Sequence, residues 1–187
     1  MSATHLRPLH GDDAADVLSA FAADPEMSRQ GDVTDLESAE AYIRQLTDRS
    51  QDNLAFAVVD RGRCVGVVAI NGSRQHQLGW FFYWVHPGTR GRGVMSQAAA
   101  TVANWALGHG EDDDGGFYRL ELGHRENNPA SGRIAAAAGF LQEGLEREKF
   151  EVGGERVDVL TYGRLRSDPP AVVGHLPLRC QQEVTCS

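Results

Sequence analysis

The order of apolar and polar positions predicts strands in the middle of the chain and at its end. Residues 54–59 and 64–70 are almost continuous apolar runs, and the turn residues 60–63 between them, Asp-Arg-Gly-Arg, are typical of a hairpin. A third strand, 78–85, is strongly aromatic. Four further strands are expected at 4–9, 117–122, 140–150 and 156–164.

Apolar residues at helical spacing predict four helices. The first is capped by Asp12 or Asp13 and continues to about Phe21. The second spans 37–49, after a polar segment at 24–35. The third helix spans 91–107, after a glycine-rich turn. The fourth helix begins at Pro129, because proline suits the first turn of a helix.

Strands followed by helices, with hairpins at both ends, favour a mixed α/β sheet over a doubly wound parallel one. The length of 187 residues suits one domain with a core large enough to need neither metals nor disulfides. We expect a domain at 1–166 and a C-terminal tail at 167–187 that is either packed or flexible.

Composition and charge narrow the class of protein. The hydrophobic content of 41% is ordinary for a soluble protein, and no apolar run approaches the ~18 residues of a membrane span. The N-terminus lacks an apolar signal core, which favours a cytoplasmic protein. Three scattered cysteines lack metal-ligand spacing, so no metal is expected. A net charge of −8 argues against nucleic-acid binding and is compatible with a cationic substrate such as an amine.

The segment 83–95 passes from the aromatic strand through a glycine- and arginine-rich turn into an alanine-rich helix. A helix start leaves backbone N–H groups without intrahelical partners, and the helix dipole adds to their attraction for phosphate. Gly91 and Gly93 let a phosphate approach the backbone, and Arg90 and Arg92 can add charge-assisted bonds. A plain strand–helix turn is the alternative, because such turns are common.

A second segment, 127–134, begins the fourth helix, which closes at Gly139-Phe140. Taken alone, Asn128 and Ser131 could equally be a helix cap and a helix-start serine. Together with the first segment they resemble the GNAT acyltransferases, in particular the ribosomal-protein N-acetyltransferases (RimJ/RimL-like). The resemblance covers about 4–165. It includes Leu6-Arg7-Pro8-Leu9, Glu143-Gly144, Asp158 and Tyr162.

The resemblance implies a single GNAT-like domain of the α/β (α+β) class. Its sheet is expected to be mixed, mostly antiparallel and twisted, with six to seven strands flanked by about four helices. The fourth and fifth strands are expected to splay apart where acetyl-CoA, the implied cosubstrate, inserts.

The resemblance also implies roles for individual residues. Asn128 would bind the pantetheine arm, and Ser131 would be the catalytic residue that stabilises or protonates the departing thiolate. A backbone N–H around residues 84–86 would stabilise the tetrahedral intermediate. The implied cofactor-binding residues are Trp84, Val85, Arg90, Gly91, Arg92, Gly93, Val94, Met95, Ser96 and Asn128. The expected acceptor-binding residues are Glu26, Phe82 and Tyr83.

The sequence departs from the family pattern at three points. Met95 occupies a position where the family's turn has a small residue. Ala135 stands where many GNAT enzymes place a tyrosine acid, which leaves Ser131 as the candidate. The aromatic strand, 78–84, carries no carboxylate to act as a base. The alternative bases are His76, Glu26, Glu121, His124 and Glu126.

The implied reaction is direct attack of a primary amine on acetyl-CoA in a ternary complex. Deprotonation at pH 7 costs about 1.4 kcal/mol for an α-amine and over 4 kcal/mol for a lysine, so a site without an obvious base favours a protein or peptide N-terminus. One alternative is acetylation or succinylation of a small amine such as an antibiotic or polyamine. A second is a non-catalytic acyl-CoA-binding module. No nucleic-acid or membrane partner is expected, and a homodimer is left open.

Overall fold

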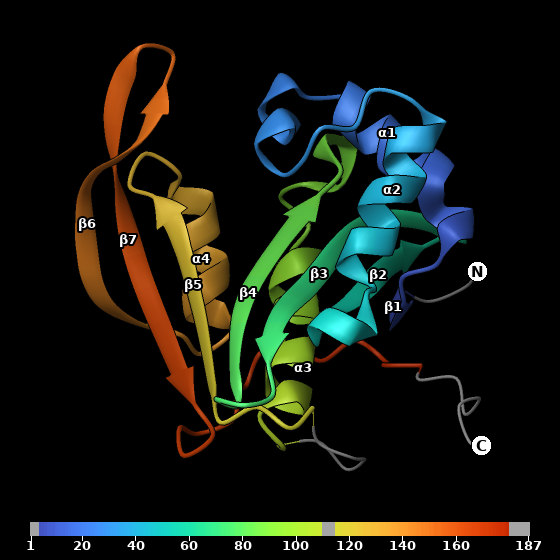
Figure 1. Cartoon of the computed structure of the whole chain (residues 1–187). Coiled ribbons are helices and arrows are strands. Elements are labelled where there is room, and N and C mark those ends of the chain that lie inside the picture. The colour runs from blue at the N-terminus through green and yellow to red at the C-terminus, as the bar shows by residue number, and fades with distance from the viewer. Residues whose placement is uncertain (1–3, 110–114, 180–187) are drawn as a thin grey trace.

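Seven strands of the computed structural model, which describes residues 4–109 and 115–179, form a single sheet (Figure 1). The strands lie in the order β1-β2-β3-β4-β5-β7-β6. Every neighbouring pair is antiparallel except β4 and β5, which run parallel. This confirms the predicted mixed, mostly antiparallel sheet. The strands are β1 (His5–Pro8), β2 (Leu54–Asp60), β3 (Arg63–Ser73), β4 (Leu78–Val85), β5 (Arg119–Arg125), β6 (Leu141–Val152) and β7 (Glu155–Leu165).

Four α-helices within the described residues cover the two faces of this sheet. From one face α1 and α2 pack on β3, and from the other α3 packs on β3 and β4 and α4 packs on β5 (Figure 1). Successive side chains of β4 point to opposite faces, so Phe81 joins the core beneath α3 and Trp84 joins the core beneath α1 and α2. The helices are α1 (Ala14–Ala22), α2 (Leu36–Leu46), α3 (Val94–Ala106) and α4 (Pro129–Ala137), with 3₁₀ turns η1 (Gly11–Asp13), η2 (Pro25–Arg29), η3 (Arg49–Gln51) and η4 (Pro87–Thr89).

The sheet opens between its two parallel strands. Pairing of β4 with β5 is limited to three positions, the last of which joins Trp80 to Glu121. Beyond that point the strands diverge, and the two halves of the sheet form a V (Figure 1). The predicted splay between the fourth and fifth strands is therefore confirmed. Because backbone groups on the inner edges of the V lack a neighbouring strand there, they are available to a ligand.

Several predicted boundaries were wrong by a few residues. The helix expected at 91–107 begins at Val94, because Gly91 and Gly93 have φ of +76° and +74° and so lie outside the helical region. The helix expected at 37–49 spans Leu36–Leu46, and the strand expected at 117–122 spans Arg119–Arg125.

The polar segment between the first two helices contains a short element that the sequence did not predict. In η2 the Asp24 carboxylate accepts a hydrogen bond from the Glu26 N–H at 2.9 Å. This cap places both acidic residues at the open end of the V, where they line the cavity described below.

The described part of the tail packs against α3 and β1. The Asn104 side chain bonds both backbone groups of Ala171, at 3.0 and 3.1 Å, and the Thr101 hydroxyl accepts from the Leu176 N–H at 3.0 Å. The Leu6 N–H donates to the Pro177 carbonyl at 2.8 Å, beside β1. Ala171 and Leu176 are buried in the core beneath the sheet. Residues 180–187, with Cys180 and Cys186, lie outside the described part.

None of the described helices is both long and apolar enough to cross a membrane. Over residues 4–109 and 115–179, no group of three or more His, Cys, Asp or Glu side chains is arranged to hold a metal ion.

Candidate active site

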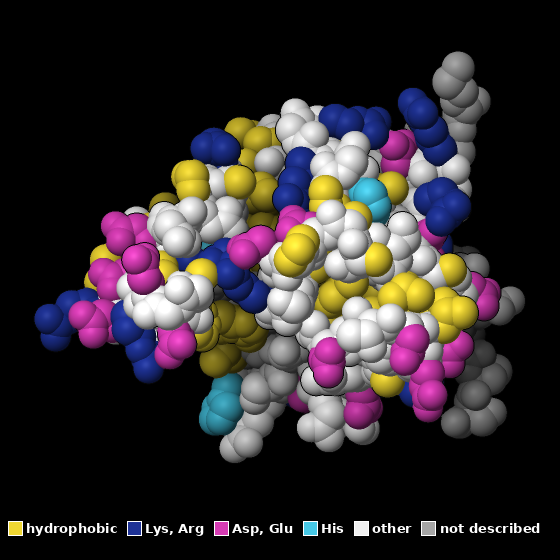
Figure 2. All heavy atoms as spheres, turned by 90° about the horizontal axis from the view of Figure 1, so that it is seen from above, with side chains coloured by type: hydrophobic (Ala, Val, Ile, Leu, Met, Phe, Trp, Pro, Cys, Tyr) yellow, Lys and Arg dark blue, Asp and Glu magenta, His cyan; other side chains and the backbone are white. Residues whose placement is uncertain are grey.

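A cavity of about 910 Å³ fills the opening of the V. Its walls come from β4 and β5, from the first turns of α3 and α4, from η2, and from the outer end of the hairpin formed by β6 and β7. Seen from above, basic and acidic side chains lie side by side between the helical part of the molecule and this hairpin (Figure 2). The cavity thus joins the two segments that the sequence analysis singled out.

The start of α3 forms one end of the cavity. The first helical hydrogen bond runs from the Gln97 N–H to the Gly93 carbonyl at 3.2 Å, and Gly93 contributes no side-chain cap. The N–H groups of the first turn therefore have no intrahelical acceptor, and together with the helix dipole they form an anion site. Val94, Met95 and Ser96 line the cavity here.

The two arginines of the turn point in different directions. Arg90 lines the cavity and its guanidinium contacts the Asp24 carboxylate at 2.6 Å. Arg92 is absent from the cavity lining, and its guanidinium contacts Asp60 of β2 at 3.1 Å. Of the residues predicted to bind the cofactor, Arg92 alone lies outside the cavity wall.

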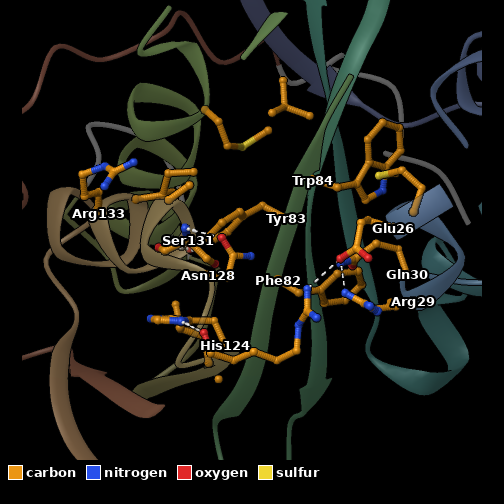
Figure 3. Close-up of a pocket in the computed structure, with 18 of the residues that line it drawn as sticks. Glu26, Arg29, Gln30, Phe82, Tyr83, Trp84, His124, Asn128, Ser131 and Arg133 are labelled. Atoms are coloured by element: carbon orange, nitrogen blue, oxygen red, sulfur yellow. Dashed lines mark hydrogen bonds and ion pairs between the residues drawn. The ribbon is translucent and has the colours of Figure 1, made fainter. Parts of the chain in front are cut away.

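The second segment brings Asn128 and Ser131 into the cavity lining. The Asn128 side-chain oxygen caps α4 by accepting from the Ser131 N–H at 3.2 Å. The Tyr83 hydroxyl reaches across from β4, donating to the Ser131 carbonyl at 2.8 Å and lying 3.1 Å from the Ser131 hydroxyl (Figure 3). Burial raises the pKa of Tyr83 to about 12. The structure therefore places Tyr83 beside the predicted catalytic residue.

The opposite side of β4 faces α1, α2 and η2. Phe82 packs against the core on that side, and the Trp84 indole N–H donates to the Tyr42 hydroxyl at 3.1 Å. Both Phe82 and Trp84 line the cavity. Because alternate residues of β4 point to opposite faces, Phe82 and Tyr83 border different halves of the cavity.

Glu26 lies across the opening of the V, within reach of two arginines. Its carboxylate contacts Arg29 in the same 3₁₀ turn and Arg125 at the end of β5, the latter at 2.9 Å (Figure 3). The Glu26–Arg125 pair joins the two arms of the sheet. Sequence reasoning missed Arg125, because no local pattern marks a strand-end arginine as the partner of a residue 99 positions away.

The five candidate bases fall into two groups, according to whether they line the cavity. Glu26 and His124 line the cavity, whereas the other three candidates do not: His76, Glu121 and Glu126. The His124 Nδ1 lies 2.8 Å from the Arg125 carbonyl, which can only accept, so Nδ1 carries the hydrogen. The other ring nitrogen lies 3.1 Å from the Tyr162 hydroxyl, from which it accepts a hydrogen bond when the imidazole is neutral. Both ring nitrogens of His124 are thus engaged.

Comparisons with known proteins agree with this geometry. The family model for the acetyltransferase (GNAT) domain matches residues 4–141. A ribosomal-protein-serine acetyltransferase of Escherichia coli (strain K12) is 26% identical over 114 residues, which are 59% of this chain and 59% of that protein. The match therefore spans less than two thirds of that relative.

Two solved structures show the same fold. RimL, the ribosomal L7/L12 alpha-N-protein acetyltransferase in complex with coenzyme A, has a TM-score of 0.74 at 20% identity, covering 87% of this chain and 95% of that one. A spermidine N-acetyltransferase SpeG chimera from Vibrio cholerae and hSSAT has a TM-score of 0.75 at 19% identity, covering 89% and 97%. With a family model matched over most of its length, and the splayed sheet that the resemblance implied, this chain belongs to the GNAT acetyltransferase family.

Proposed function

We propose that this protein transfers the acetyl group of acetyl-CoA to the α-amine of a protein or peptide N-terminus. The observation that carries the choice of acceptor is the pairing of the cavity's carboxylates with arginines. Asp24 contacts Arg90, and Glu26 contacts Arg29 and Arg125. Unpaired carboxylates, which a polyamine with several positive charges needs, are therefore scarce on the acceptor side.

The balance of charges in the cavity lining also favours an α-amine over a polyamine. Basic side chains outnumber acidic ones in its lining, although the chain as a whole carries a net charge of −8. The basic residues are Arg29, Arg90, Arg125, Arg133 and Lys149, and the acidic ones are Asp24, Glu26 and Glu151. Such a surface favours the phosphates of the cosubstrate and an acceptor with one positive charge.

The cost of deprotonation also favours an α-amine. The cavity's two candidate bases are engaged, Glu26 with arginines and His124 with Tyr162. At pH 7 an α-amine loses its proton at a cost of about 1.4 kcal/mol, against over 4 kcal/mol for a lysine. Water in an open cavity can take the proton of an α-amine without a dedicated strong base.

The cosubstrate lies along the α3 and α4 side of the opening in this proposal. Its phosphates bind the N–H groups of residues 91–96, its pantetheine arm passes Asn128, and its sulfur faces Ser131. The amine nitrogen attacks the thioester carbon, the C–N bond forms, and the C–S bond breaks with its electron pair going to sulfur. The amine proton leaves to water, and the Ser131 hydroxyl stabilises the thiolate.

The N–H of Val85 is the donor we propose for the oxyanion of the tetrahedral intermediate. The His86 N–H is already used, because it donates to the Val65 carbonyl of β3 at 2.8 Å. Successive N–H groups of a strand point to opposite edges, so the Val85 N–H points to the open edge beside β5. A preformed donor at that edge stabilises the charge that develops on the carbonyl oxygen.

Turnover on three kinds of acceptor tests this function. The panel contains peptides with free N-termini, the same peptides with blocked N-termini and a lysine, and spermidine. We expect release of the coenzyme A thiol with the free N-termini, and mass spectrometry should place one acetyl group on the α-amine. Turnover on spermidine alone would contradict the acceptor. Coenzyme A binding without turnover on any amine would instead support the non-catalytic module.

A further inference from the structure

We infer that Tyr83 is a positioning residue: its hydroxyl holds the Ser131 side chain in the orientation from which it meets the departing thiolate. The inference rests on the role proposed above for Ser131. Tyr83 comes from β4 and Ser131 from the first turn of α4, 48 residues later, so their contact spans the opening of the V.

The hydrogen-bond chemistry of the pair is defined by its acceptors. A tyrosine hydroxyl has one hydrogen, and the Ser131 carbonyl, 2.8 Å away, can only accept it. The Ser131 hydroxyl, at 3.1 Å, can then donate to the lone pair of the tyrosine oxygen. Tyr83 therefore contacts both the backbone and the side chain of Ser131, which fixes the position of α4 and the rotamer together.

The tyrosine itself is held in place by packing. Its ring lies edge-on against Phe81, with centroids 6.1 Å apart, and Phe81 in turn packs on Phe140 at 5.3 Å. With its ring fixed in this way, the side chain has little rotational freedom left. Burial raises the pKa of Tyr83 to about 12, so its hydroxyl stays protonated and remains a hydrogen-bond donor to the Ser131 carbonyl.

The reaction makes use of this arrangement at one step. As the C–S bond breaks, the Ser131 hydroxyl hydrogen turns from the tyrosine oxygen to the sulfur. Tyr83 meanwhile keeps its bond to the Ser131 carbonyl, so the backbone does not move. Without the Tyr83 hydroxyl, the Ser131 side chain can occupy other rotamers. Fewer enzyme molecules then have the serine hydroxyl aligned with the sulfur when the thiolate leaves.

Tyr83→Phe in the full-length chain tests the inference, because it removes the hydroxyl and keeps the ring packing. Hydroxylamine serves as the acceptor, with its uncatalysed reaction with acetyl-CoA subtracted, so that the identity of the natural acceptor does not enter. We expect kcat to fall about tenfold while the dissociation constant for coenzyme A changes less than twofold. The matched control is Tyr118→Phe, which removes the hydroxyl of an exposed tyrosine outside the cavity and should leave both values unchanged.

A double-mutant cycle separates positioning from general structural damage. Ser131→Ala should lower kcat at least as much as Tyr83→Phe, and adding Tyr83→Phe to Ser131→Ala should cause no further loss. An unchanged kcat in Tyr83→Phe, or the same tenfold loss in the Ser131→Ala background, would overturn the inference. Failure of the wild-type protein to acetylate peptides would count against the proposed acceptor alone, since hydroxylamine turnover reports on Tyr83 separately.

Discussion

The terminal methyl of Met95 occupies the space that a side chain on Gly66 would need. A Cβ placed on Gly66 would lie 2.9 Å from the Met95 Cε and 2.7 Å from the Trp84 carbonyl oxygen. Met95 is buried, with its side chain beneath β3. A long side chain at a position where the family's turn has a small one is thus accommodated by a glycine in the strand above, and the turn's backbone stays clear.

Gly66→Ala should therefore destabilise the protein by about 1–3 kcal/mol, because the added methyl overpacks the core and presses on a strand carbonyl. Urea unfolding measures the change. Gly11→Ala is the control, since a Cβ there meets no atom within 4 Å. Combining Gly66→Ala with Met95→Ala should cost less than the two changes added together. A Gly66→Ala variant as stable as the control would mean that the two residues are not in contact.

Arg90→Ala should weaken coenzyme A binding by about tenfold, because it removes a cation from the cavity wall and with it one charge-assisted bond to phosphate. Arg92→Ala should have the smaller effect, because Arg92 contacts Asp60 and lies outside the cavity. Isothermal titration calorimetry with coenzyme A compares the two variants. A larger loss in Arg92→Ala would show that the Asp60 pair opens when the cosubstrate binds.

Arg125→Ala should raise the rate with spermidine relative to that with a peptide. The change removes one of the two arginines that neutralise Glu26, whose side chain is 56% exposed and therefore accessible to a cationic acceptor. The ratio of kcat/KM for the two acceptors is the measurement, and we expect an increase of about fivefold. Lys149→Ala, which removes a cavity cation paired with Glu146, is the control. An unaltered ratio would mean that Glu26 does not discriminate between acceptors.

Asn104→Ala should destabilise the protein by about 2–4 kcal/mol, because it removes the side-chain partner of both backbone groups of Ala171 and one of the acceptors of the buried Arg164 guanidinium. Asn104 bonds both backbone groups of Ala171 and accepts from the Arg164 guanidinium at 2.5 Å. Thermal unfolding gives the loss of stability, and limited proteolysis should cut the tail sooner. Gln45→Ala, on the exposed face of α2, is the control. If the tail were cut at the same rate in both variants, the Asn104 contacts would not be what holds the tail against the domain.

The features that the sequence predicted well depend on residues close together in the chain. Strand positions follow from continuous apolar runs, and the start of α4 follows from Asn128, which caps an N–H three positions later. The beginning of α3 was misplaced because glycine permits both helical and left-handed backbone, and spacing alone does not distinguish them.

By itself, then, the sequence determined the mixed sheet, its splay through the family resemblance, and the two segments that line the cavity. Only the tertiary structure decided which side chains meet in that cavity. Tyr83 reaches Ser131 over 48 residues, Arg125 reaches Glu26 over 99, and Arg92 turns to Asp60 over 32. These contacts depend on how far β4 and β5 diverge and on how the helices pack on each face. Local propensity and spacing carry no information about either.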